Sequence, residues 1–182
     1  KQLVAWVWDA GTANTTASTD GSITPSAQRV NNTVGLSIST FTGTGANATI
    51  GHGLSVKPDF VMIKNRQTSS QSWACWHNSL TTPGTGYLEL DNDSTEANHA
   101  TWWNSTAPTN TVVSLGTATQ SNNDGTMMMY AWAGVPGFSS FGRYEGTGDV
   151  DGPFYYCGFR PALVILKCVD PPSTDWIMYD NR

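Results

Sequence analysis

Two adjacent tryptophans followed by an asparagine, Trp102, Trp103 and Asn104, are the residues best suited to binding a sugar. The apolar C–H face of a pyranose stacks on an indole, and its hydroxyls suit an asparagine amide. Pro108 follows closely, so we expect a loop in which both indoles are difficult to bury. The sequence therefore predicts a glycan-binding site at these three residues. The alternative is that one tryptophan fills the core while the other packs on the surface.

Acidic and histidine side chains give weaker indications of chemistry. Residues 91–96 place oxygen ligands at alternate positions, as calcium loops do, but the glycine of an EF-hand is missing, which favours a solvated acidic loop. The three histidines lack the spacing of a zinc site. Glu89, Glu96 and Glu145 are too far apart in sequence to predict the carboxylate pair of a glycoside hydrolase. We therefore expect no catalytic residue, no metal and no cofactor.

Composition limits which elements can position such residues. The chain has 182 residues, of which 24 are Thr, 17 Ser and 13 Asn, whereas only three are Glu and four Lys, so a helical bundle is excluded. Eight Trp, six Tyr and six Phe supply enough apolar surface to exclude a disordered chain. The net charge of −5, without a basic run, argues against nucleic acid as a partner. No stretch of 18 apolar residues occurs, so we expect no membrane insertion.

Short runs of β-branched and aromatic residues, separated by Gly, Pro, Asn and Asp, predict an all-β fold. Residues 93–103 are the one candidate for a helix, and residues 9–33 and 116–125 are expected to be loops. Cys157 and Cys168 could form a disulfide across a hairpin, although buried free thiols are favoured. Twelve strands are predicted, at residues 3–8, 37–42, 49–53, 60–64, 73–77, 87–90, 112–115, 126–132, 141–145, 154–157, 163–168 and 176–179.

The chain matches itself when it is shifted by 103 residues. Residues 41–45 fall on 144–148, and residues 57–64 fall on 160–167, with Trp73 on Trp176 and Asn78 on Asn181. Three blocks at one offset indicate an internal duplication. We therefore predict two related, jelly-roll-like β-sandwich units, the second incomplete. The expected divisions are a terminal strand with a polar arm at 1–34, a first unit at 35–133 and half of a second unit at 134–182.

The N-terminal run 3–6 is similar to residues 128–132, the strand that precedes the second copy. A terminal strand at one end and an unfinished unit at the other would leave a sheet edge without a partner. One way to cover that edge is strand donation by a neighbouring subunit, with residues 3–8 as the donor.

Several strings resemble a domain found in structural proteins of marine bacteriophages. They are Gly35-Leu36-Ser37-Ile38-Ser39-Thr40-Phe41-Thr42-Gly43-Thr44-Gly45, residues 50–54 and 57–58, residues 135–144, and residues 151–154 and 158–161. The resemblance implies a tail-fibre-like or lectin-like virion component, related to concanavalin-type sandwiches, and carries over no catalytic or ligand-binding residue.

These observations lead us to expect a non-enzymatic structural module of a virion or appendage, located outside the cell or on the virion surface. Its expected partners are other copies of itself or other virion and fibre proteins, together with a host-surface polysaccharide. The alternative is a self-assembling filament or coat subunit that exchanges strands between neighbours. A polysaccharide depolymerase is the least supported function.

Overall fold

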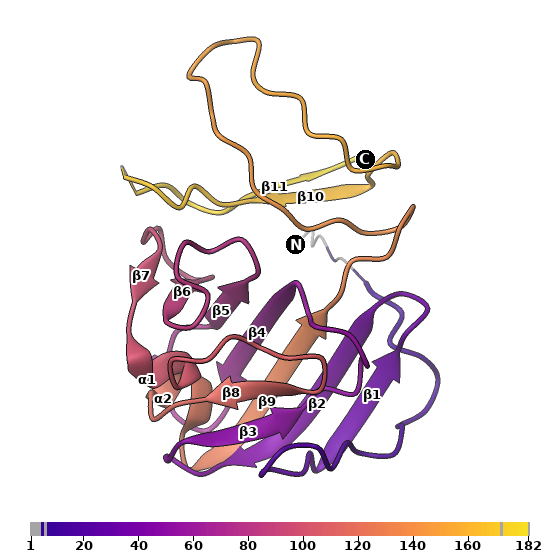
Figure 1. Cartoon of the computed structure of the whole chain (residues 1–182), viewed down its shortest axis with the longest axis vertical. Coiled ribbons are helices and arrows are strands. Elements are labelled where there is room, and N and C mark those ends of the chain that lie inside the picture. The colour runs from indigo at the N-terminus through magenta and orange to yellow at the C-terminus, as the bar shows by residue number, and fades with distance from the viewer. Residues whose placement is uncertain (1–4, 6, 172, 182) are drawn as a thin grey trace, which may run out of the picture.

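The computed structural model describes residues 5, 7–171 and 173–181, and the fold is all-β. Its body is a seven-stranded antiparallel sheet in the order β1-β2-β9-β4-β5-β6-β7 (Figure 1). The strands of this sheet are β1 (Ala27–Asn31), β2 (Leu36–Gly43), β9 (Gly125–Trp132), β4 (Phe60–Asn65), β5 (Ala74–His77), β6 (Gly86–Glu89) and β7 (Ala97–Asn98).

A short antiparallel ribbon of β3 (Ala48–Gly51) and β8 (Val112–Leu115) covers one face of the sheet and makes the body a β-sandwich. Residues alternate between the two faces of a strand. In β9, Met127, Met129 and Ala131 therefore point into the core and are fully buried. Ile50 and Leu115 of the ribbon meet them from the other layer, so the core lies between the ribbon and the central strands.

Two single-turn helices, α1 (Ala100–Trp103) and α2 (Thr119–Asn122), lie beside the ribbon. The predicted helix at 93–103 is wrong over its first part, where β7 adds an edge strand to β6. Glu96 does not act as a capping residue, since its carboxylate accepts hydrogen bonds from Thr81 and Thr82. His99 caps α1 instead, because its side chain accepts a hydrogen bond from the backbone N–H of Thr101.

Nine of the twelve predicted strands correspond to strands of the structure, two are wrong, and one lies partly outside the described residues. The aromatic runs at 141–145 and 154–157 have no partner strand and form no strand themselves. Half of the strand predicted at 3–8, residues 3, 4 and 6, lies outside the described residues, and Ala5, Val7 and Trp8 form no strand. The loop predicted at 9–33 is also partly wrong, because β1 pairs with β2 along all five of its residues.

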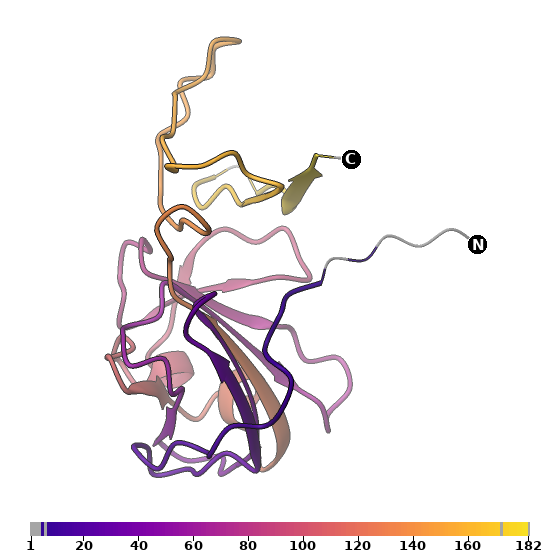
Figure 2. The same cartoon turned by 90° about the vertical axis from the view of Figure 1, so that its right-hand side faces the viewer.

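The remaining strands, β10 (Leu163–Leu166) and β11 (Ile177–Asp180), form an antiparallel hairpin outside the body. Figure 2 shows this hairpin above the sandwich, with the segment between β9 and β10 projecting away from it. The turn end of the β10–β11 hairpin contacts the region around β6 and β7. Lys167 Nζ donates to the carbonyl oxygen of Asp93, and Trp176 Nε1 donates to that of Glu89.

The β10–β11 hairpin has the same register as the β4–β5 hairpin after a shift of 103 residues. Phe60 pairs with His77 in the first hairpin, and Leu163 pairs with Asp180 in the second. All four residue pairs of the two strands match at this offset. The backbone N–H of Asn78 donates to the carbonyl oxygen of Asp59, and that of Asn181 donates to Ala162 in the same way. Lys64 donates its side-chain amine to the carbonyl oxygen of Gln71, and Lys167 donates to that of Thr174.

Candidate functional site

The structure places the predicted sugar-binding tryptophans inside the protein. Trp103 is fully buried and its Nε1 donates to the carbonyl oxygen of Gly86 at 2.9 Å. Trp102 is 6% exposed and stacks on Tyr87, with ring centroids 3.7 Å apart and planes at 9°. Only Asn104 of the three reaches the surface, where it ends α1 with a positive φ of 49°. Neither indole therefore offers a ring face to a sugar in this structure.

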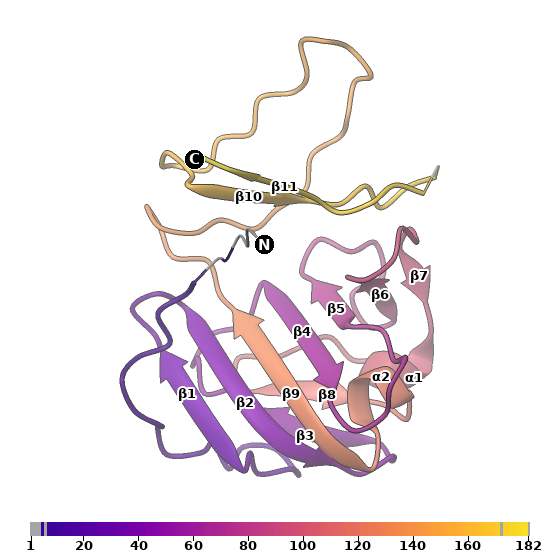
Figure 3. The same ribbon diagram turned by 180° about the vertical axis from the view of Figure 1, so that it is seen from behind.

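A row of aromatic rings lies on the face of the sheet opposite the β3–β8 ribbon (Figure 3 views the molecule from this side). Tyr130 stacks on Trp132 at 5.9 Å, Trp132 on Phe60 at 5.6 Å, and Phe60 on Phe141 at 6.3 Å. The planes of each pair lie within 29° of parallel. The four rings are half-buried, and the row covers this side of the sheet.

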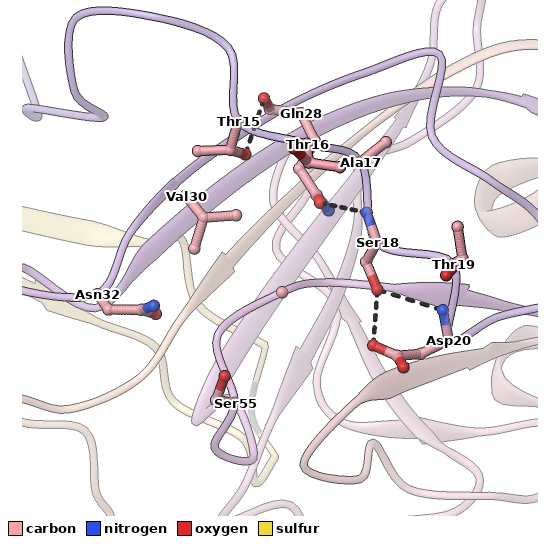
Figure 4. A pocket seen from close by; sticks show the side chains of 11 residues that line it. Thr15, Thr16, Ala17, Ser18, Thr19, Asp20, Gln28, Val30, Asn32 and Ser55 are labelled. Carbon is pink, nitrogen blue, oxygen red and sulfur yellow. Dashed lines mark hydrogen bonds between the residues drawn. The ribbon is translucent and has the colours of Figure 1, made fainter.

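A polar cleft of about 520 Å³ lies at the β1 edge of the sandwich (Figure 4). Three segments form it: residues 15–20, strand β1 with Asn32 after it, and the loop at 53–55. The eleven lining residues are small or polar, include no aromatic ring and are Thr15, Thr16, Ala17, Ser18, Thr19, Asp20, Gln28, Val30, Asn32, Gly53 and Ser55.

Gln28 of β1 links the segment at 15–20 to strands β2 and β3. Its side chain is 1% exposed and uses both ends of its amide. The oxygen accepts a hydrogen bond from the backbone N–H of Ser18 at 2.9 Å, and the nitrogen donates to Ser39 Oγ and to the carbonyl oxygen of Gly51, both at 2.9 Å. A buried amide costs free energy unless it is fully hydrogen-bonded, so this arrangement fixes the floor of the cleft against β2 and β3.

The segment at 15–20 forms one wall of the cleft. Thr15 donates its backbone N–H to the carbonyl oxygen of Gln28 at 2.8 Å, so the segment runs along β1. Ser18 Oγ donates to the carboxylate of Asp20 at 2.7 Å and accepts from the Asp20 backbone N–H (Figure 4). These bonds orient the exposed Asp20 carboxylate at the end of the wall.

The loop at 53–55 forms the opposite wall, and His52 supports it from below. His52 is fully buried, its Nδ1 accepts from the backbone N–H of Leu54, and Nε2 lies 3.2 Å from the carbonyl oxygen of Thr109. Nε2 must therefore carry the proton, and burial lowers the pKa of this imidazole by disfavouring its charged form. Ser55 has a φ of 61°, an unfavourable left-handed conformation for a serine.

The cleft has the chemistry of a site for neutral polar groups. Within the part of the chain that the structure describes, the side chains of Thr16, Thr19, Asn32 and Ser55 make no hydrogen bond to protein. Their hydroxyl and amide groups can both donate and accept hydrogen bonds. Asp20 is the single carboxylate in the lining, and no cluster of three metal-ligating side chains occurs among the described residues.

The glutamates lie elsewhere and already have partners. Glu96 accepts from Thr81, Glu89 accepts from Asn92 Nδ2, and Glu145 forms an exposed ion pair with Arg143. The three cysteines are free thiols, so the disulfide considered for Cys157 and Cys168 is not formed. Burial strongly raises the pKa of the Cys75 thiol, which keeps it protonated.

Sequence reasoning missed the cleft because it assigned residues 9–33 to a featureless loop. The one local signal was the density of hydroxyl-bearing residues at 15–19. Gln28 carried no signal, because an inward-facing polar residue interrupts the apolar alternation that identifies a strand.

Comparison with known proteins gives one match. No curated protein and no solved structure matches the chain. The two helices of the described residues are single turns of four residues, whereas a membrane-spanning helix needs about 20. A family model described as a domain of unknown function, DUF7483, matches residues 1–182, so the chain belongs to the DUF7483 family.

Proposed function

We propose that this chain is a non-enzymatic structural module of an extracellular or virion-surface assembly, and that its polar cleft binds an uncharged glycan. The observation that carries the proposal is the lining of the cleft, in which four side chains with free hydrogen-bonding groups face a rigid floor built on Gln28. Sugar hydroxyls donate and accept hydrogen bonds in the same way as these side chains do. The resemblance to phage structural proteins supports the location.

The charge of the cleft favours a neutral ligand over an acidic one. Asp20 is the only charged side chain in the lining, and its carboxylate would repel a uronate or sialate brought near it. A hydrolytic function has less support here, since glycoside hydrolysis uses two carboxyl groups about 5–9.5 Å apart. We therefore assign binding, and not cleavage, to the cleft.

We also propose that residues 134–182 repeat part of the first sandwich unit. The support is the shared register of β4–β5 and β10–β11 together with the recurrence of their lysine and backbone hydrogen bonds. In this interpretation the chain carries one complete β-sandwich and a hairpin of a second, as in fibrous proteins built from repeated modules.

The glycan proposal is tested by array screening followed by titration. The chain is applied to an array of neutral and acidic bacterial polysaccharides, and the dissociation constant of the best neutral oligosaccharide is measured by calorimetry. Asn32→Ala and Thr16→Val should each weaken binding about tenfold, because each removes a hydrogen bond to the ligand. Thr42→Val is the matched control, since Thr42 is exposed on β2 outside the cleft.

Binding of acidic polysaccharides alone would contradict the proposal, and so would equal losses in the cleft variants and the control. Release of reducing ends from the bound polysaccharide, abolished by Asp20→Asn, would replace it with a hydrolytic function.

A further inference from the structure

The lining of the polar cleft includes one small apolar area. Val30 of β1 is half-buried, and it packs against the core and also lines the cleft. A Cβ added to Gly53 would lie 2.9 Å from a methyl carbon of Val30, so the glycine leaves that methyl uncovered. Ala17 adds a second methyl group to the lining. The cleft therefore offers aliphatic contact to a small apolar group.

Because this area is aliphatic, it suits only certain parts of a sugar. None of the described residues that line the cleft is aromatic. The C–H face of a pyranose is usually buried by stacking on an aromatic ring. A plain hexose has no alkyl group to place on Val30, and a hydroxyl pressed against this side chain would lose a hydrogen bond to water. We therefore expect a ligand that carries a small alkyl group beside its hydroxyls.

Free hydrogen-bonding groups lie close to the apolar area. Asn32 follows Val30 by two residues and also lines the cleft, and Ser55 lies in the loop after Gly53. In the part of the chain that the structure describes, neither side chain bonds to protein. Figure 4 shows both on the same side of the cleft as Val30, across from the segment at 15–20. An amide on a ligand has one N–H donor and one carbonyl acceptor, and Asn32 and Ser55 can satisfy both.

We propose that the glycan bound in the cleft carries an N-acetylhexosamine, with its acetyl methyl on Val30 and its amide hydrogen-bonded to Asn32 and Ser55. This inference rests on the proposed glycan-binding function and names the sugar class that the same site takes. An acetamido group joins a methyl to an amide, which is the combination of apolar and polar contacts that this part of the cleft provides.

Asp20 lies on the far side of the cleft from Val30 (Figure 4). Its exposed carboxylate accepts a hydrogen bond from Ser18 Oγ and retains further acceptor positions for sugar hydroxyls. A free amino sugar is the competing ligand, since its ammonium group would be attracted to this carboxylate. The area around Val30 disfavours that ligand, because an ammonium placed there loses hydration without gaining a charged partner.

The sugar class is tested with the full chain on neutral bacterial polysaccharides that either contain or lack N-acetylhexosamine. The chain should retain those that contain it. Chemical de-N-acetylation of the best-bound oligosaccharide should weaken binding about tenfold, because a methyl contact and a hydrogen bond are lost, and re-acetylation should restore it. Equal retention of neutral polysaccharides without N-acetylhexosamine, or undiminished binding after de-N-acetylation, would overturn this inference and leave glycan binding standing. Failure to bind any uncharged polysaccharide would overturn both.

Two further measurements place the acetyl group on Val30. Val30→Thr exchanges a methyl for a hydroxyl at nearly equal size and should weaken binding of the N-acetylated oligosaccharide about fivefold. The matched control is Val112→Thr, which makes the same exchange at a half-buried strand position outside the cleft and should change binding less than about twofold. Saturation-transfer NMR needs no variant, and the acetyl methyl protons should receive the strongest transfer from the unmodified chain. Equal losses in the two variants, or transfer stronger at the ring protons than at the methyl, would overturn the inference.

Discussion

The two hairpins of this protein share a register but differ completely in burial. Ala74, Cys75 and Trp76 of β5 are fully buried, whereas their counterparts Ile177, Met178 and Tyr179 of β11 are 45%, 38% and 61% exposed. Local contacts are alike in both, including the lysine that donates to a carbonyl oxygen seven residues on. Local sequence is therefore sufficient to set a hairpin's register, while its burial depends on the strands and layers beside it.

The sandwich body supplies those neighbours for β4 and β5. β9 and β6 flank β4 and β5, and the β3–β8 ribbon covers their inner face. A two-stranded hairpin alone is at best marginally stable in water, so the stability of β10–β11 in this chain depends on its docking at residues 89–96. The comparison predicts different responses of the two hairpins to the same perturbation.

The largest loss of stability is expected from truncating Trp76 of β5, whose counterpart in β11 is the exposed Tyr179. Trp76→Ala removes a fully buried indole whose Nε1 donates to the Pro83 carbonyl oxygen, and should lower the free energy of unfolding by about 3–5 kcal/mol. Tyr179→Ala, at the equivalent position, should change it by less than about 0.5 kcal/mol. Urea unfolding monitored by tryptophan fluorescence measures both. Equal losses would show that the second hairpin belongs to the same cooperative core.

Amide hydrogen exchange should show the difference in stability between the two hairpins in the unmutated chain. Amides that pair β4 with β5 open only with the whole sandwich, whereas those that pair β10 with β11 open when the hairpin undocks. We expect the β10–β11 amides to exchange at least about 100-fold faster at a protein concentration where the chain is monomeric. Comparable protection in the monomer would mean that the docking contacts hold the hairpin as firmly as the core holds β4–β5.

The pH dependence of stability should come from two histidines of the sandwich body. Burial lowers the pKa of both His52 and His77 in the folded state, so the unfolded chain binds more protons below about pH 6.5. The contribution of the two histidines to stability is therefore full above that pH and falls as the pH decreases from about 6.5 toward the lower folded pKa values. Denaturant unfolding at pH 7 and pH 5 measures the difference.

The double variant His52→Asn, His77→Asn is the control for that titration. It should be less stable at pH 7, since Leu54 and Ser79 lose the ring nitrogens that accept their backbone N–H groups. Its stability should nevertheless vary much less between pH 7 and pH 5. A pH dependence unchanged in the double variant would assign the effect to other groups.

The sequence predicted the elements whose signal is local. Residues 112–115 have the predicted bounds of β8, and the shift of 103 residues anticipated the matching hairpins. The aromatic runs at 141–145 and 154–157 have the same β propensity but lack a neighbouring strand, so propensity alone was insufficient. β1 was missed because its sequence, AQRVN, is mostly polar and its inward residue is Gln28.

The candidate site could not be predicted for a related reason. Its walls come from residues 15–20 and 53–55, which are far apart in sequence. Gln28 of β1 bonds to Ser18 in the first wall and to Gly51, the end of the strand that leads into the second. Trp102 and Trp103 were predicted to bind a glycan because two adjacent indoles in a loop are difficult to bury together. A single helical turn resolves that difficulty, since it directs Trp102 to Tyr87 and Trp103 to Gly86.

The smallest effect on stability is expected from replacing the lysine that each hairpin carries at the matching position, Lys64 in the first and Lys167 in the second. Lys64 donates to the Gln71 carbonyl and lies 5.4 Å from the centre of the Trp73 ring, so Lys64→Met should lower the free energy of unfolding by about 0.5–1 kcal/mol. Lys167 donates to the carbonyl oxygen of Thr174 within its hairpin and to that of Asp93 in the sandwich body. Lys167→Met should leave global unfolding unchanged but speed exchange of the β10–β11 amides about fivefold, because a hydrogen bond worth about 1 kcal/mol is lost only there. Urea unfolding and hydrogen exchange of both variants provide the check, and a global loss for Lys167→Met as large as that for Lys64→Met would mean that the two hairpins unfold as one unit.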